Sequence, residues 1–230
     1  MDFNVRIHQI FQIGNIYVPI TETMVSTWII MAVLIAFAIF VRVKLNSFTE
    51  CPKGFQNVIE LLVEVFNKFV INTGGRRLAY LSSWFFTVFL FVALSNISGM
   101  FFLRPPTADW TVTFPLAFVT FLLIQGLAFK YNTKEHIKGL FQPIFLFFPL
   151  NVLGECAKPI SLSFRLFGNV LGGVILLSMI YGMAPLILRI PLPIILHGYF
   201  DFAIGLLQAY VFVTLSLAFI GAAADTSSET

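Results

Sequence analysis

Apolar residues are grouped in this chain into long blocks, separated by short polar stretches. A helix needs about 20 apolar residues to cross the hydrocarbon of a bilayer. We therefore predict an all-α polytopic membrane protein, which forms a single integral membrane domain over residues 1–230. The five predicted membrane helices are 24–43, 82–103, 112–129, 151–184 and 194–223.

Three other segments break this pattern. In residues 52–72, apolar residues recur at helical spacing between polar ones, which predicts an amphipathic helix lying at the membrane interface. An ordinary soluble helix is the weaker alternative, because no soluble domain surrounds the segment. Residues 1–20 are short and mixed, and we expect a surface segment on the outer side. Pro143 and Pro149 predict a broken or re-entrant entry over residues 140–150.

The last two helices are too long to stand upright in a membrane. At 1.5 Å per residue, the segment 151–184 extends for roughly 50 Å, against about 30 Å of hydrocarbon. We expect both helices to tilt strongly or kink. Arg189, Pro191 and Pro193 mark the turn between them, so residues 151–223 are predicted to form a helix hairpin.

Composition narrows the class further. Hydrophobic residues make up 58% of the chain and charged residues 11%, whereas soluble proteins average about 25% charged residues. The basic residues are too scattered for a nucleic-acid surface. With the amino terminus outside and the carboxyl terminus cytoplasmic, the cytoplasmic loops carry the larger share of Lys and Arg, as the positive-inside rule requires. The residues on that side are Arg42, Lys44, Lys53, Lys68, Arg76, Arg77, Lys130, Lys134 and Lys138, and those outside are Arg6, Arg104 and Arg189.

Arg165 is the most unusual residue of the chain, because it lies within an apolar helix. A central Arg costs about 3 kcal/mol on insertion scales, so its presence indicates compensation or use of the charge. A stripe of small residues alone would indicate helix packing, but packing does not require a guanidinium. Asn169 lies beside Arg165, and the residues that share its helical face are Gly154, Lys158, Ser161, Gly168 and Gly172.

The last helix carries a matching polar face of His197, Asp201 and Gln208. Antiparallel pairing would bring Gln208 near Arg165 and leave Asp201 nearer the hairpin turn. An intramembrane carboxylate and amide facing an Arg favour a hydrated ion route. The alternative is a buried ion pair that only fixes the hairpin. We interpret His197 as an interface residue rather than a proton relay.

Other ionisable residues allow two interpretations each. Glu155 and Lys158 are one turn apart, and they form a structural pair or line a cytoplasmic mouth of the ion route. Asp109 follows Pro105 and Pro106 in an outer turn, where stabilising the turn is favoured over a place on the route.

The chain has no phosphate-binding loop, zinc-ligand spacing or nucleophile elbow. We predict no enzymatic activity of its own, no cofactor and no metal, so the energy for transport must come from an ion gradient or a partner.

The sequence SLSFRLFGNVLGG at 161–173 follows AKP and precedes LLQAYVF at 206–212. Together with the PTAD turn at 106–109, it resembles subunit a of the bacterial F-type ATP synthase over nearly the whole chain. The resemblance implies a stator subunit against a rotating ring of c subunits, each with one carboxylate in mid-membrane. It also implies peripheral-stalk b subunits, a catalytic head reached through the stalk, surrounding lipid, and the bacterial plasma membrane as the location.

The resemblance also implies roles for single residues. Arg165 matches the essential Arg of the family, Asn169 its neighbouring Asn, and Gln208 its partner Gln. The Arg would force ion release from the ring carboxylate and block leakage between two offset half-channels. Many relatives carry an acidic residue or His where this chain has Val174, so Asp201 alone remains of the usual outer pair. The expected ion is H⁺, with Na⁺ as the alternative.

Two other classes are compatible with an intramembrane Arg. A secondary transporter of an anionic solute would use Arg165 to bind a carboxylate, but the inverted repeat typical of such proteins is not evident in the sequence. A structural scaffold would tolerate Arg165→Leu.

Overall fold

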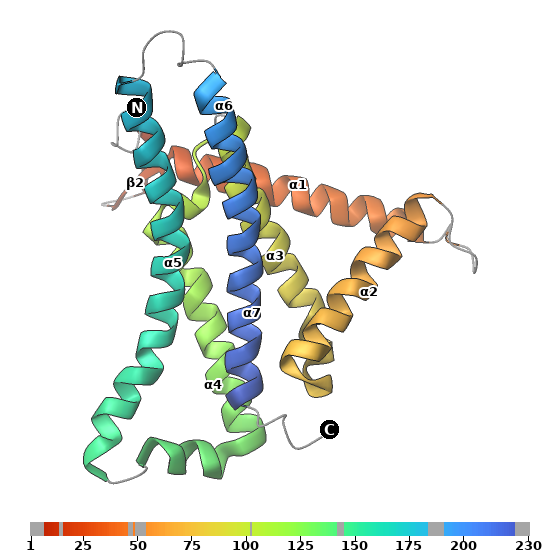
Figure 1. Ribbon diagram of the computed structural model, residues 1–230, viewed down its shortest axis with the longest axis vertical. Helices are drawn as coiled ribbons and strands as arrows, with labels where there is room; N and C mark the ends of the chain where they lie inside the picture. Colours follow the sequence, from red (N-terminus) through yellow and green to blue (C-terminus); the bar gives the residue numbers. More distant parts are fainter. Residues whose placement is uncertain are drawn as a thin grey trace. The chain divides into compact units, whose positions relative to one another are not determined.

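The structure, a computed structural model, describes residues 7–13, 16–45, 48, 54–101, 103–141, 145–183 and 191–223 (Figure 1). Within these residues, five helical segments are long and apolar enough to cross a membrane. Each overlaps one of the five predicted blocks, so the prediction of a polytopic helical membrane protein is confirmed. The segments are Glu22–Lys44, Arg76–Phe101, Trp110–Tyr131, Phe148–Ile180 and Ile195–Ala223.

The membrane segments are built from helices of different lengths. Helix α1 spans Glu22–Lys44, and α4 spans Trp110–Phe141. Helix α3 spans Ser82–Ile97 and is continued at both ends by short 3₁₀ helices. These are η2 at Arg76–Leu81 and η3 at Ser98–Phe101, and a further 3₁₀ turn, η4, covers Pro106–Ala108.

A β-hairpin precedes the first membrane helix, and the sequence analysis did not predict it. Strands β1 (Ile7–Ile13) and β2 (Ile16–Thr21) pair antiparallel, with Ile13 opposite Ile16. Two residues, Gly14 and Asn15, separate the strands in the sequence. A Gly-Asn pair between two β-prone runs is typical of hairpins, so this signal was present but was not used.

Helix α2 (Phe55–Gly74) matches the predicted amphipathic helix. Its Phe66 ring packs against Phe86 and Phe89 of α3, with ring centroids 5.1 and 5.7 Å apart. On its exposed side, Lys68 forms an ion pair with Glu64 at 2.7 Å, which holds the pKa of the Glu64 carboxyl below its ordinary value. Its predicted start at Pro52 lies outside the described residues, and its place at the membrane interface stays a prediction.

Helix α5 is the longest of the described helices, with 36 residues from Phe148 to Met183. A 3₁₀ turn, η5 (Phe145–Phe147), precedes it, so Pro149 falls in the first helical turn, where its missing N–H costs nothing. The expected break over 140–150 is partly outside the described residues, and the segment 184–190 is wholly outside them. The tilt of α5 stays a prediction.

The last helix differs from the regular α-helix that the spacing predicted. Helix α6 (Pro191–His197) passes into a π-helix, η7 (Gly198–Ile204), and then into α7 (Gly205–Ala223). At the second junction, the Asn96 amide donates to the Gly205 carbonyl at 2.9 Å. A Cβ on Gly205 would lie 2.6 Å from the Asn96 Cβ, so this close approach requires glycine. Tertiary contact therefore overrides the α-helical spacing here, and π turns of this kind occur frequently at functional sites.

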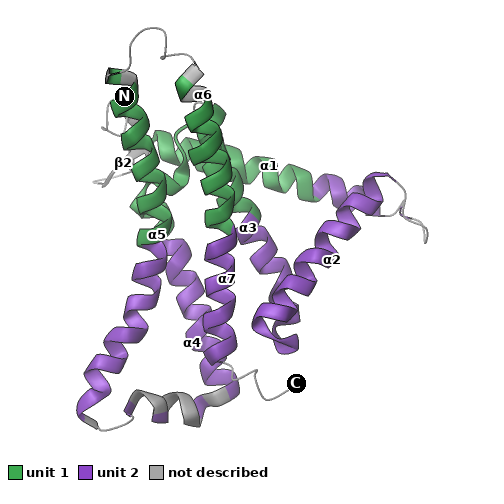
Figure 2. Ribbon diagram, in the orientation of Figure 1, with its two compact units in different colours: residues 1–38, 90–113, 164–209 green, residues 39–89, 114–163, 210–230 purple. Residues whose placement is uncertain are grey.

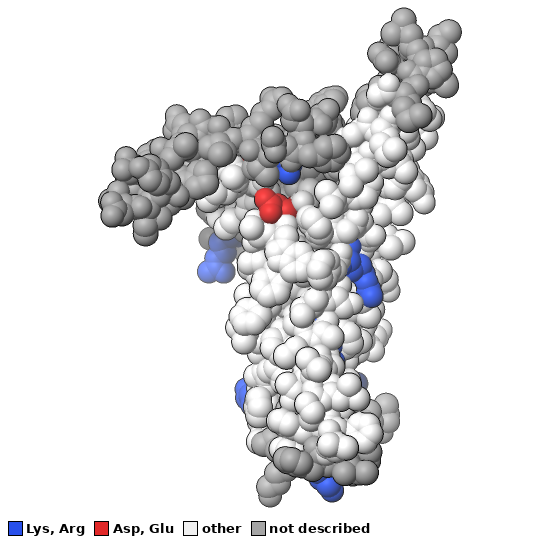
Figure 3. Space-filling view, turned by 90° about the vertical axis from the view of Figure 1, so that its left-hand side faces the viewer, with Lys and Arg blue, Asp and Glu red and all other residues white. Residues whose placement is uncertain are grey.

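The chain divides into two compact units, coloured separately in Figure 2. Unit 1 comprises Met1–Ala38, Leu90–Thr113 and Phe164–Ala209, and unit 2 comprises Ile39–Phe89, Phe114–Ser163 and Tyr210–Thr230. Each has buried apolar residues of its own, such as Leu166 in unit 1 and Phe85 in unit 2. On the face drawn in Figure 3, residues other than Lys, Arg, Asp and Glu make up most of the described surface, as a membrane-embedded chain requires. The prediction of a single integral domain stays a prediction.

Candidate functional site

A narrow cleft in unit 1 gathers polar side chains that are far apart in the sequence. Its empty volume is about 280 Å³, including the part that opens outward. Amide and carboxyl groups lie among its lining residues, so it offers polar partners to a water molecule or an ion. Its lining residues come from α3, α5, η7 and α7 and are Asn96, Asn169, Val170, Gly173, Phe200, Asp201, Ile204, Gly205 and Gln208.

An amide pair joins the two long helices across this cleft. The Asn169 Nδ2 group donates to Gln208 Oε1 at 2.6 Å. The Gln208 side chain is 2% exposed, and its Nε2 donor has no hydrogen-bond partner among the described residues. The structure joins Gln208 to Asn169, one turn beyond Arg165 on α5, and the expected approach of Gln208 to Arg165 stays a prediction. A buried donor without a partner is costly, so Nε2 is a place where a water molecule in the cleft would be stabilised.

Asp201 lies at the cleft wall in η7 and contacts His197. The Asp201 Oδ2 atom is 2.6 Å from His197 Nδ1, and both side chains are largely buried. From the sequence, we interpreted His197 as an interface residue. In the structure, His197 is the direct partner of the Asp201 carboxylate. A Cβ on Gly99 would lie 2.8 Å from Asp201 Oδ2, so the carboxylate rests against the bare backbone of η3.

Arg165 projects from α5 one turn before Asn169, and its side chain is exposed. It forms no hydrogen bond or ion pair with the described residues of its unit. The residues on either side of it are anchored instead. The Trp110 ring lies 4.2 Å from Phe164 and 6.1 Å from Phe167 between centroids. These ring contacts help to fix the turn of α5 that carries Arg165.

The glycines of the predicted Arg165 face are open. A Cβ added at Gly168 or Gly172 would meet nothing within 4 Å, and the same is true of Gly154 in unit 2. Ser161 is exposed as well. Among the residues that the structure describes, no helix of the same unit packs against Gly168 or Gly172. This open space is compatible with a partner at this face.

Asp109 stabilises the start of α4, as the favoured interpretation predicted. Its Oδ1 accepts from the Thr111 backbone N–H at 3.1 Å and from the Thr111 hydroxyl at 2.8 Å. Its Oδ2 accepts from the Thr23 hydroxyl of α1 at 3.2 Å. This is the arrangement of a helix N-cap, with an added tie to α1.

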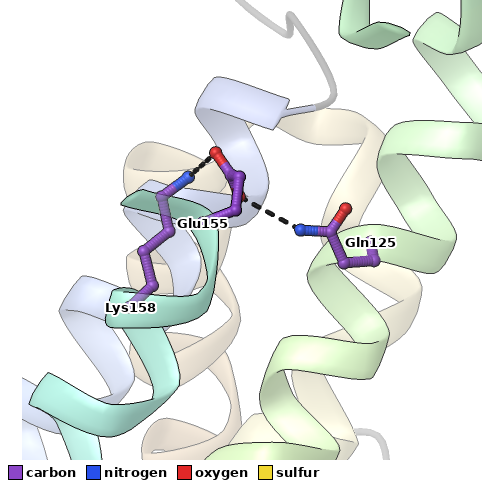
Figure 4. A network of polar contacts seen from close by, with 3 residues as sticks. All are labelled: Gln125, Glu155 and Lys158. Carbon is purple, nitrogen blue, oxygen red and sulfur yellow. Dashed lines mark hydrogen bonds and ion pairs between the residues drawn. The ribbon is translucent and has the colours of Figure 1, made fainter. Parts of the chain in front are cut away.

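A second polar group lies in unit 2 and is drawn in Figure 4. The Lys158 ammonium donates to Glu155 Oε1 at 2.5 Å, and Gln125 of α4 donates to Glu155 Oε2 at 3.1 Å. The Lys158 Nζ atom also lies 5.5 Å from the centre of the Phe219 ring of α7. Both carboxylate oxygens of Glu155 therefore have donors, and the pair links α5 to α4 and α7. This geometry fits a structural pair and also a fixed charge beside an ion mouth.

Four residues that complete the cleft of unit 1 and the Glu155 group of unit 2 were not predicted from the sequence: Asn96, Gly99, Thr107 and Gln125. Asn96 and Gln125 are amides inside otherwise apolar spans, and an intramembrane polar group is a functional hypothesis by default. An amide inside an apolar span could therefore have identified both Asn96 and Gln125 from the sequence. Gly99 and Thr107 carry no such signal, because their importance arises from contacts with Asp201 and Asn96.

The fold and these polar groups define a multi-pass membrane protein with charged and amide side chains inside its spans, the pattern of an ion-conducting subunit. Residues 24–221 match the family described as "ATP synthase A chain". The chain belongs to this family, which supports the role of an ion-translocating stator component of the ATP synthase complex.

Individual relatives agree with the family match. The chain is 38% identical over 225 residues to ATP synthase subunit a of Moorella thermoacetica, covering 94% of this chain and 96% of the relative. It is 32% identical over 220 residues to "ATP synthase subunit a, sodium ion specific" of Propionigenium modestum, covering 88% and 73%. It is also 32% identical over 227 residues to the chloroplastic subunit a of Oedogonium cardiacum, covering 93% and 86%.

The contact between Gly99 and Asp201 predicts an effect on ion flux. In Gly99→Ala the new Cβ would force the Asp201 carboxylate to rotate away, which costs little stability because the carboxylate is the mobile end of its side chain. We expect ion flux through the membrane sector to fall about tenfold, as misplaced groups typically cause. The measurement is passive flux per assembled complex in vesicles.

Gly182→Ala is the matched control, because a Cβ at Gly182 of α5 meets nothing within 4 Å. We expect it to leave flux unchanged. Equal flux in the Gly99→Ala and Gly182→Ala complexes would contradict a role for the placement of Asp201.

Proposed function

We propose that this chain is the H⁺-translocating stator subunit of an F-type ATP synthase, in which Arg165 faces the carboxylates of a rotating c ring. The observation that carries the proposal is the exposure of Arg165 within a membrane span, on a face whose small residues leave open space. A guanidinium in hydrocarbon is costly unless an anion or water accompanies it. The ring carboxylate that the family provides is such an anion.

The charge of Arg165 accounts for the direction of ion transfer. A guanidinium favours the ionised form of a nearby carboxylate, so a ring carboxylate that reaches Arg165 releases its proton. The guanidinium stays charged under all physiological conditions, and it therefore also repels cations that would leak past the ring. Arg165 thus separates two half-channels that carry protons to and from the ring.

The cleft in unit 1 supports an outer half-channel. Sequence reasoning left Asp201 as the sole ionisable group there, because Val174 replaces a group that many relatives carry. His197 at 2.6 Å from Asp201 supplies a second ionisable group from the same helix. Asn169 and Gln208 lie on the same cleft and would guide the proton toward the ring. The relay is therefore assigned to a His–Asp pair on one helix.

The polar group of unit 2 supports the inner half-channel. Glu155 and Lys158 are both partly exposed, at 24% and 29% of their side chains, so water can reach them. Ser161 lies one turn further along α5. A fixed ion pair at the mouth would keep the route hydrated and carry protons to the cytoplasmic side.

The remaining assignments follow from the family and the charge pattern. The partners are the c ring, the peripheral-stalk b subunits and, through the stalk, the catalytic head. The location is the bacterial plasma membrane, with the amino terminus outside, because the larger share of Lys and Arg then lies on the cytoplasmic side. H⁺ is favoured over Na⁺ because a carboxylate paired with imidazole is suited to proton exchange.

Removing the charge at Arg165 tests the proposed function. We expect Arg165→Ala to abolish ATP synthesis driven by an ion gradient, because no group would force release from the ring. The assay is ATP synthesis in membrane vesicles that contain assembled complex. Lys138→Ala is the control, since Lys138 is an exposed cation at the end of α4, and it should retain synthesis. Normal synthesis in Arg165→Ala would refute the proposal.

The identity of the ion has its own test. At fixed pH and fixed membrane potential, ATP synthesis by vesicles should not change as Na⁺ is varied, because protons alone load the ring. The rate is measured from nominally Na⁺-free to high-Na⁺ buffer at constant ionic strength. A rate that rises and saturates with Na⁺ would assign the sodium ion and would leave the role of Arg165 intact.

A further inference from the structure

Among the described residues that line the cleft, Asn96 is the polar residue that comes from outside the long helices. It is 2% exposed, and it lies near the end of α3. Its amide makes two bonds. Nδ2 donates to the Gly205 carbonyl at 2.9 Å, and Oδ1 accepts from the Thr107 hydroxyl at 2.6 Å.

The chemistry of the neighbours fixes the orientation of this amide. A backbone carbonyl can only accept a hydrogen bond, so the nitrogen of Asn96 must face Gly205. Its oxygen then faces Thr107, which lies in the η4 turn and is fully buried. Both ends of the Asn96 side chain are thus engaged, and the residue connects η4 to the start of α7.

Gly205 is the point at which the π-helical segment η7 returns to an α-helix. Its N–H donates to the carbonyls of Phe200 and Phe202, and its own carbonyl accepts from Asn96. A π-helix is rare because its packing and hydrogen bonding are less favourable than those of an α-helix, so an external bond at its end helps to maintain it. This contact leaves no room for a side chain, because a Cβ added at Gly205 would clash with Asn96.

The π-helical segment decides where Asp201 points. Asp201 lies in the middle of this segment, and His197 is the residue immediately before the segment begins. An α-helix turns by a larger angle per residue than a π-helix. If the segment relaxed to an α-helix, the Asp201 side chain would therefore point in a different direction about the helix axis relative to Gln208. The cleft needs both residues on its wall.

We propose that Asn96 is a positioning residue for ion transfer, which acts through Asp201 by holding the π-helical segment Gly198–Ile204 at the Gly205 carbonyl. This inference rests on the proposed function, in which Asp201 takes part in the outer half-channel. It assigns Thr107 a supporting part, because its hydroxyl orients the amide. Asn96 itself need not exchange a proton.

The structural half of the inference is tested by hydrogen exchange in the purified complex. Asn96→Leu removes both bonds, and Asn96→Asp keeps the size and the acceptor for Thr107 but removes the donor. In each variant, we expect amide exchange in peptides covering 198–209 to rise about three- to tenfold, the effect of one lost buried hydrogen bond. Ser95→Ala is the control, because the buried Ser95 hydroxyl has no partner among the described residues. Unchanged exchange in Asn96→Asp would overturn the inference.

The functional half is tested by a double-mutant cycle on passive proton flux per assembled complex. We expect Asn96→Asp and Asp201→Asn each to reduce flux about tenfold, and the double variant to be no slower than Asp201→Asn alone. Additive losses would show that Asn96 does not act through Asp201 and would refute the inference. This outcome is distinct from failure of the proposed function, which is read from ATP synthesis in Arg165→Ala and leaves the exchange result unaffected.

Discussion

The permanent charge of Arg165 in a membrane span is the constraint on which the rest of the structure depends. A guanidinium keeps its charge, and the described residues of unit 1 offer it no ion pair. In the proposed function, a carboxylate of the c ring meets the cost of this charge in hydrocarbon. Gly168 and Gly172 leave open space on the same helix, which would let another subunit approach closely.

Several side-chain contacts hold the residues of unit 1 near Arg165 and the cleft in place. Trp110 anchors the turn of α5 that carries Arg165, and Asn169 bonds Gln208 across the hairpin. A third tie runs from Thr107 through Asn96 to the Gly205 carbonyl. Polar groups that are fixed in this way need little reorganisation when an ion passes, which is the general advantage of a preorganised site. In the proposed function, a stator would benefit from that property, because each c subunit in turn would pass the same fixed groups.

The sequence was sufficient for features that depend on composition and helical period. The five membrane segments and the amphipathic helix α2 followed from apolar block length and spacing. The anchoring role of Asp109 followed from its place after two prolines. Arg165 stood out because the cost of its charge is independent of tertiary detail.

Other features depend on contacts that helical period cannot reveal. The π-helical segment is one, since the spacing of His197, Asp201 and Gln208 reads equally well as a regular α-helix. The position of Gln208 is another. Its hydrogen bond to Asn169 depends on the exact register of the two helices, which helix pairing alone does not define. The role of Gly99 emerges only when the Asp201 carboxylate is seen against it.

Disulfide cross-linking in the intact complex tests most directly whether the open face of α5 meets the rotor. Cys51 and Cys156 would first be replaced by Ser, and a cysteine would then be placed at Gly168 and, in the ring, next to its carboxylate. The account predicts rapid cross-linking from Gly168→Cys and none from Ile39→Cys, on the exposed surface of α1. Failure of Gly168→Cys to cross-link to the ring, with Ile39→Cys doing so instead, would contradict it.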